Sequence, residues 1–404
     1  MALKNVSWLR SPEPEAVLWR STLMFVALDV FFTGLVGAYA YSHAGVLAVL
    51  LFIMVQQTCS MLGQVLSQSA MHRYSLAPLR AQRVGVYGLA LTLLAAGLAP
   101  IPVPYLLIIL CFCGGFARGM TYGARLWMEA QLVHAGRRQH YLSMVEGSAI
   151  VFKLAAPSLS LLVLSFTPRF ETIFLLAGTA FCMLLAATPA KRGIFNSPED
   201  YQLLALWRQK EYWRTAPYFL VDGAGHALRT ALFVSGAMSV VGSLKDYAMV
   251  EICAGILAAT WLFSQSRVAL TGPSMKKLRK FLALLALAWA CLLGAMWQPL
   301  LFPVFVVVYT LSLPLVNAQK SGVTLGGMVK ADGGVESNLM ARSILLTISR
   351  IATLGAFIAA YLMGSSAKAL LIAMAVTAIL LLPIEYWTAR RLHRPASVLT
   401  TLPQ

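Results

Sequence analysis

The chain has 404 residues, of which 59% are hydrophobic and 12% are charged. Soluble globular domains carry about 25% charged residues, so this composition excludes a soluble enzyme, a disordered chain and a disulfide scaffold. The net charge of +17 would indicate nucleic acid as a partner if the protein were soluble. The composition instead predicts a helical protein that crosses a membrane many times.

Apolar segments of the length needed to cross a bilayer recur along the whole chain. A helix needs about 20 apolar residues to span the hydrocarbon core, and breaks at Gly, Pro or charged clusters separate the candidates. The sequence therefore predicts an all-α membrane protein with twelve transmembrane helices, near 20–42, 44–68, 84–100, 102–127, 141–166, 171–189, 216–241, 247–266, 281–297, 299–327, 341–364 and 366–388.

The basic residues predict the orientation of these helices. If the N-terminus is cytoplasmic, the cytoplasmic segments and span edges, with Arg342 among them, hold 23 Lys and Arg, against 3 on the outer side. This bias follows the positive-inside rule and places both termini in the cytoplasm. We expect the basic loops to contact membrane lipid and expect no nucleic-acid partner. The short loops favour a bacterial inner membrane.

The two halves of the chain carry similar short patterns. Ser67-Gln68-Ser69 recurs as Ser264-Gln265-Ser266, and Lys153 corresponds to Arg350, both 197 residues apart. The longest polar loop lies between the halves. We therefore predict four segments: a six-helix half over 1–189, a cytoplasmic linker over 190–215, a second six-helix half over 216–389, and a cytoplasmic tail over 390–404.

The span count, duplication and central loop resemble the major facilitator superfamily of secondary transporters. The loop 69–80 keeps Arg73 and Arg80 at basic positions of that family's loop motif, lacks the acidic residue and has Ser75 in place of a glycine. The stretch 114–123, around Arg118, is also similar to a family pattern. The resemblance implies two pseudo-symmetric six-helix halves, alternating access, and a central cavity lined by spans one, four, seven and ten.

Charged residues inside the predicted spans mark candidate functional positions. A charge inside a span costs roughly 2.5–3.5 kcal/mol on insertion scales, so such residues pair or face a wet cavity. On span seven, Asp222, His226 and Arg229 have the spacing i, i+4 and i+7, which places them on one helix face. A second such face on span four holds Arg118, Tyr122, Arg125 and Glu129.

The positions of these residues on the helix faces suggest a role for each of them. We expect substrate contacts from Arg118, Tyr122, Asp222, Arg229, Asn317 and Lys320. A His beside a carboxylate titrates near neutral pH, so we expect proton coupling through Asp29, Asp222 and His226. Gate residues or structural ion pairs are expected at Arg125, Glu129, Glu146, Lys153 and Arg350.

The alternative for several of these charges is a purely structural pair between helices. Asp29 with Arg118, and Glu146 with Lys153, are the pairs that the sequence suggests. Glu385, near a membrane face, is expected to be an interfacial residue.

The predicted function is secondary active transport of a small organic anion or zwitterion, driven by protons. Efflux of amphipathic compounds and a non-transporting sensor or scaffold remain alternatives. We expect no enzymatic activity, no cofactor and no metal, since no Walker motif or metal-ligand spacing occurs. The expected partner is a small-molecule substrate, and we expect a monomer.

Overall fold

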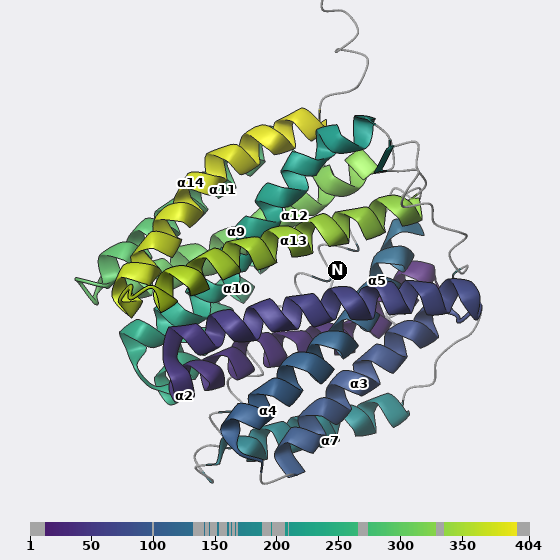
Figure 1. The fold of residues 1–404 in the computed structure, drawn as a ribbon, viewed down its shortest axis with the longest axis horizontal. Coiled ribbons are helices and arrows are strands. Elements are labelled where there is room, and N and C mark those ends of the chain that lie inside the picture. The colour runs from purple at the N-terminus through teal and green to yellow at the C-terminus, as the bar shows by residue number, and fades with distance from the viewer. Residues whose placement is uncertain are drawn as a thin grey trace, which may run out of the picture.

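The computed structural model describes residues 13–98, 101–131, 169–187, 210–265, 274–328 and 335–393, with single positions at 141, 145, 152, 160, 163, 166, 195, 207 and 208. The regular elements of this part are all helical (Figure 1). Their bounds are α2 Pro14–Arg73, α3 Pro78–Leu98, α4 Val103–Ile109, the π-helix η1 Leu110–Gly114, α5 Gly115–Gln131, α7 Phe170–Ala187, α9 Lys210–Val241, α10 Leu244–Gln265, α11 Met275–Ala295, α12 Leu301–Met328, α13 Val335–Leu362 and α14 Ala367–His393.

The prediction of an all-α membrane protein is confirmed. Among the described residues, seven helices are long and apolar enough to cross a bilayer, or eight if the bent pair α9–α10 is one span. Predicted span 141–166 lies almost wholly outside the described residues, as do most of the linker 190–215 and of the tail 390–404. The number twelve and the division into two halves therefore stay predictions.

Helix α2 contains two antiparallel segments. Sixty residues of straight helix would measure about 90 Å, three times the thickness of a bilayer core. Helical geometry is lost at Ala44 and at Gly45, whose φ of 66° lies in the left-handed region that glycine tolerates. The rings of Phe32 and Phe52 lie 6.1 Å apart, although twenty residues of straight helix would separate them by about 30 Å. The chain therefore turns back at Gly45, as the first two predicted spans require.

The helices form two packed groups that meet along α2. Helices α3 and α5 pack with α2, and α7 packs with α3. Helix α9 packs with α13 and α14, while α11 packs with α12 and α14. In Figure 1 the purple and blue helices of the first group lie below the green and yellow helices of the second. Contacts of α2 with α9 and α13 join the groups, and the candidate site lies between them.

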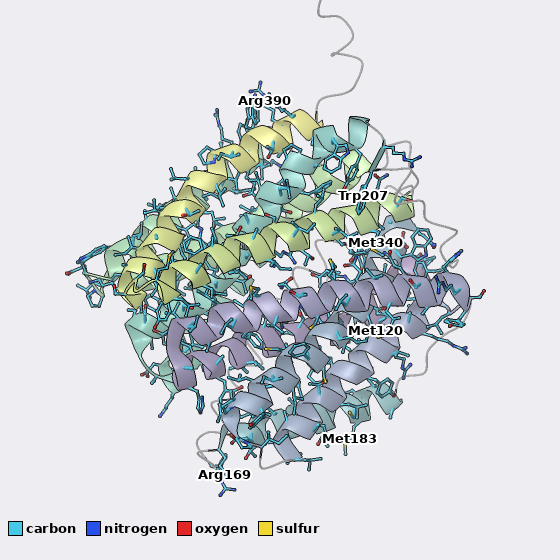
Figure 2. All side chains as sticks on the ribbon, in the orientation of Figure 1. Met120, Arg169, Met183, Trp207, Met340 and Arg390 are labelled. Carbon is cyan, nitrogen blue, oxygen red and sulfur yellow. The ribbon has the colours of Figure 1, made fainter. Side chains whose placement is uncertain are left out.

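The outer surface of the bundle is apolar. Leu98, Met183 and Leu380 are 65%, 67% and 64% exposed, and Figure 2 shows Met183 at the edge of the bundle on α7. Exposed patches of this kind are rare on soluble monomers. They are expected where lipid covers the protein surface.

Backbones approach closely where α5 crosses α2. A Cβ added to Gly119 would lie 1.8 Å from the carbonyl oxygen of Ser60, so only glycine fits at this crossing. Small residues at helix crossings are the usual means of close packing in membranes. The crossing sets the glycine side of α5 against the second segment of α2, while the charged face of α5 meets the first segment at Asp29 and Phe25.

Helices α9 and α12 run antiparallel, and two side-chain contacts set their register. The rings of Phe233 and Tyr309 stack with centroids 4.9 Å apart, and Lys320 contacts Asp222. Phe233 follows Asp222 by eleven residues on α9, and Tyr309 precedes Lys320 by eleven residues on α12. Eleven residues are about three helical turns, so the two contacts have the same spacing on both helices. The aromatic stack, reinforced by Trp289 on α11 at 5.0 Å from Tyr309, therefore positions the charged pair.

Candidate functional site

A cavity of about 240 Å³ lies between the two groups of helices. Its walls come from α2, α5, α9, α12 and α13. The lining is mostly polar or charged, and comprises Gln57, Ser60, Met61, Gln64, Arg118, Tyr122, Arg125, Leu126, Glu129, Asp222, His226, Arg229, Asn317, Lys320, Ser321, Arg342, Ser343, Leu346, Thr347 and Arg350.

At one wall, Arg118 of α5 pairs with Asp29 of α2. The guanidinium Nε contacts one carboxylate oxygen, and Nη2 donates a hydrogen bond of 3.2 Å to the other. Arg118 is 8% exposed, and its guanidinium also lies over the ring of Tyr122, 5.8 Å from the centroid. The structure contains this pair, which the sequence suggested as the structural alternative, and Asp29 neutralises Arg118 from the side away from the cavity.

Four charged residues form an ion network on the opposite wall. Asp222 and Arg229 come from α9, Lys320 from α12 and Glu385 from α14. Arg229 lies 3.5 Å from Asp222 and 3.3 Å from Glu385, and the Lys320 ammonium contacts both carboxylates. Two cations and two carboxylates balance one another in this four-residue network.

The position of Glu385 corrects the sequence-based expectation. Glu385 was expected at a membrane interface, but it is 1% exposed and holds both Arg229 and Lys320. Its place near the end of an apolar segment suggested a boundary residue. The helix α14 in fact continues to His393, which leaves Glu385 two turns inside it.

A third pair lies further along α5. Arg125 donates a 2.7 Å hydrogen bond to Glu129, one helical turn away. The same carboxylate oxygen accepts a bond of 3.2 Å from the Tyr141 hydroxyl. The Arg125 guanidinium lies 5.7 Å from the centroid of the Tyr122 ring, so this pair and Arg118 share one aromatic neighbour.

The arginines of α13 are arranged differently. Arg342 and Arg350 line the cavity, and neither has a carboxylate within salt-bridge distance among the residues that the structure describes. The Nε atom of each is buried without a hydrogen-bond partner in the same part of the chain. Arg350 donates to the neutral amide oxygen of Gln57 on α2.

A second bond joins the same two helices. The Gln64 amide donates to the Ser343 hydroxyl at 2.7 Å. Gln64 and Gln57 lie two turns apart on α2, so the two bonds connect α2 and α13 along one side of the cavity.

The structure brings together most of the residues singled out by their spacing. All six residues expected to contact substrate line one cavity, with His226, Arg125, Glu129 and Arg350. Asp29 lies behind Arg118. Glu146 and Lys153 lie outside the described residues.

Arg342 is the charged residue of the cavity lining that the sequence reasoning missed. It was assigned to the cytoplasmic edge of a span, yet it lines the cavity. A signal was present, because Arg342, Leu346 and Arg350 have the spacing i, i+4 and i+8 and therefore share one helix face.

The described residues offer no clear place for a metal. No group of three or more His, Cys, Asp or Glu side chains with suitable placement occurs in that part of the chain. The four carboxylates at the cavity, Asp29, Glu129, Asp222 and Glu385, lie next to arginine or lysine instead.

Comparisons with known proteins identify the fold. No family model matches the chain, and no curated protein matches its sequence. A solved structure of a POT family transporter in complex with 5-aminolevulinic acid matches with a TM-score of 0.70 and 12% identity, over 94% of this chain and 96% of that one.

Two further transporters have the same architecture. A D-xylose–proton symporter matches with a TM-score of 0.60 and 13% identity, over 91% of this chain and 96% of that one. The human organic anion transporter MFSD10 matches with a TM-score of 0.62 and 14% identity, over 93% and 100% of the respective chains. These matches are to transporters rather than enzymes, and they extend over nearly the whole chain. The protein is therefore an integral membrane protein with the helical fold of the major facilitator superfamily of transporters.

Proposed function

We propose that the protein is a secondary active transporter that moves a small organic anion or zwitterion by alternating access. The observation that carries the proposal is the charged cavity between the two groups of helices. Transporters place substrate sites between their repeats near the middle of the membrane. Ionisable residues are costly inside a membrane and usually mark such pathways.

The lining supports a small polar cargo over an amphipathic one. Of twenty lining residues, only Met61, Leu126 and Leu346 have aliphatic side chains. Pockets for drug-sized ligands are mostly apolar and enclose about 300–1,000 Å³, whereas this cavity holds about 240 Å³. These features favour transport of a small polar metabolite over the alternative of drug efflux.

The substrate contacts in this proposal come from six cavity residues. The carboxylate of Asp222 suits an amino group, and the amide of Asn317 suits a hydroxyl or carbonyl. The complete set is Arg118, Tyr122, Asp222, Arg229, Asn317 and Lys320.

Proton coupling is the second part of the proposal, through Asp29, Asp222 and His226. Both carboxylates contact cations across helix boundaries, Asp29 with Arg118 and Asp222 with Lys320. A proton taken up by either carboxylate would weaken its ion pair and free a cation to move. Protonation and helix movement would then be coupled through the same contacts.

The remaining charges are proposed as structural or gating groups. Arg125 and Glu129 pair within α5, and Arg350 bonds to Gln57 across the cavity wall. Glu146 and Lys153 complete this proposed set. We also propose an inner-membrane location with both termini cytoplasmic, since the basic loops support that orientation.

Uptake into proteoliposomes tests the function. Purified protein is reconstituted, and a panel of radiolabelled organic anions, amino acids and sugars is offered with and without an inward proton gradient. We expect uptake of an anion or zwitterion that rises with the gradient and falls in Asp222→Asn and Arg118→Gln. The matched control is Arg279→Gln, which changes an exposed arginine that does not line the cavity.

The outcomes separate the alternatives. Uptake that is the same with and without the gradient would reject proton coupling and would still support transport. Accumulation of amphipathic cations instead would support efflux. A folded protein that neither binds nor moves any compound of the panel would support the sensor or scaffold and overturn the proposed function.

A further inference from the structure

The charges around the cavity do not cancel. Six side-chain cations line it: Arg118, Arg125, Arg229, Lys320, Arg342 and Arg350. Four carboxylates pair with them in the described part of the chain: Asp29, Glu129, Asp222 and Glu385. Among the residues that the structure describes, the cations of the cavity therefore exceed their carboxylate partners by two.

This excess is located on one helix. Arg118, Arg125, Arg229 and Lys320 each contact a carboxylate, whereas Arg342 has no such partner among the described residues. Arg350 has only the neutral oxygen of Gln57. Both cavity arginines that lack a carboxylate within salt-bridge distance in the described residues therefore belong to α13.

The two arginines are placed to act together. They lie two helical turns apart, about 12 Å along the axis, and both line the same cavity. Ser343 and Thr347 lie between them in sequence and also line the cavity. The Ser343 hydroxyl donates to the Leu339 carbonyl oxygen and accepts from Gln64. The Nε of each arginine is buried without a partner in the described region.

Arg342 and Arg350 are half-buried, and a charge that is partly removed from water is unfavourable unless a partner compensates it. The guanidinium group has a planar fork of donors that fits carboxylate and phosphate oxygens in pairs. Two such groups in one cavity fit an anion with two negative charges, or with one at each end of a short chain.

We propose that Arg342 and Arg350 form the anion-binding pair of this cavity, and that the cargo is an organic dianion, either a short dicarboxylate or a phosphate monoester. The inference rests on the proposed transport function and narrows its substrate class. It also adds Arg342 to the substrate contacts and moves Arg350 from the gating residues to the substrate contacts.

Matched probes that differ mainly in charge test the inference. Binding to the purified protein is measured by thermal shift and by isothermal titration at pH 7.5 in low-chloride buffer. The carboxylate series is succinate, succinamate and succinamide, extended by malonate, glutarate and adipate. The phosphate series is ethyl phosphate and diethyl phosphate. Comparing the two series distinguishes a compact dianion from one whose two charges are separated.

We expect binding by a dianion of one series and weaker binding by its monoanionic or neutral partner. Arg342→Gln and Arg350→Gln should each raise the Kd of that dianion about tenfold or more, since each removes a charge-assisted hydrogen bond. Arg350→Lys keeps the charge and should retain more affinity than Arg350→Gln. Arg279→Gln, an exposed control, should bind as the wild type does.

Three results would overturn the inference: equal binding of neutral and dianionic probes, unchanged affinity in both glutamine variants, or no binding by any dianion. Uptake of the same panel into proteoliposomes separates this failure from failure of the transport function. Uptake of a monoanion or zwitterion without dianion binding would reject the dianion site and keep the transporter. Absence of all uptake would reject both.

Discussion

Glu385→Gln is the sharpest test of the four-residue ion network. The substitution keeps the shape of the side chain and an oxygen that accepts hydrogen bonds, but removes the negative charge. Glu385 is 1% exposed and contacts both Arg229 and Lys320. In the variant, Asp222 would be the one remaining carboxylate of the network for these two cations.

The expected loss of stability follows from this arrangement. Removal of one partner from a buried ion pair costs about 3–5 kcal/mol, because the other charge stays buried without compensation. Asp222 still compensates part of the positive charge of Arg229 and Lys320. We therefore expect a loss of stability at the lower end of this range, about 3 kcal/mol. Adding Lys320→Met to the Glu385→Gln variant leaves Arg229 and Asp222, whose charges balance. The double variant should therefore lose less stability than the two single variants together, with a coupling energy of about 2 kcal/mol.

Equilibrium unfolding in mixed micelles, with helical circular dichroism as the signal, measures these free energies. Glu171→Gln is the control, because Glu171 accepts a 3.2 Å hydrogen bond from the neutral Tyr39 hydroxyl. Glu171→Gln keeps an oxygen that can accept this bond and removes only its charge, so the substitution should cost about 1 kcal/mol or less. If Glu385→Gln is no worse than this control, or if the Glu385 and Lys320 effects are additive, the network does not stabilise the fold as argued.

Three further outcomes are expected from thermal melts in detergent, without ligand. Arg118→Gln should lower the melting temperature, because it leaves the Asp29 carboxylate without its ion pair; an unchanged value would contradict this. Arg342→Gln should leave the melting temperature unchanged or raise it, since it removes a cation that has no carboxylate within salt-bridge distance among the described residues. A marked decrease would contradict this. Gly119→Ala should destabilise the fold by about 1–3 kcal/mol through overpacking, because the added Cβ would meet the Ser60 carbonyl. A melting temperature and a yield of folded protein in size-exclusion chromatography equal to those of the wild type would refute the close crossing.

Helical spacing predicted which residues share a face but not which residues pair across helices. Arg118, Tyr122 and Arg125 were placed on one face of a span from their spacing, and all three line the cavity. The contact between Arg229 and Glu385 joins residues 156 positions apart, and no local pattern encodes it.

The two errors have one physical cause. Arg342 and Glu385 lie near the ends of apolar segments, where a charge normally marks the membrane surface. Both α13 and α14 extend past those ends, so these charges lie within helices and near the cavity. Hydropathy locates the apolar part of a helix, whereas helix length and packing decide which flanking charges are buried.

The hydrogen bond between Arg350 and Gln57 makes cargo binding compete with a contact between helices. Gln57 holds the guanidinium that the proposed cargo needs, and Gln64 with Ser343 forms a second link between α2 and α13. A dianion that displaces Gln57 replaces a neutral acceptor with a charged one and removes one of these two links. A ligand shifts a conformational equilibrium only by its difference in affinity for the two states. The exchange of partners at Arg350 supplies such a difference, so the loaded protein would separate α2 from α13 more readily than the empty one.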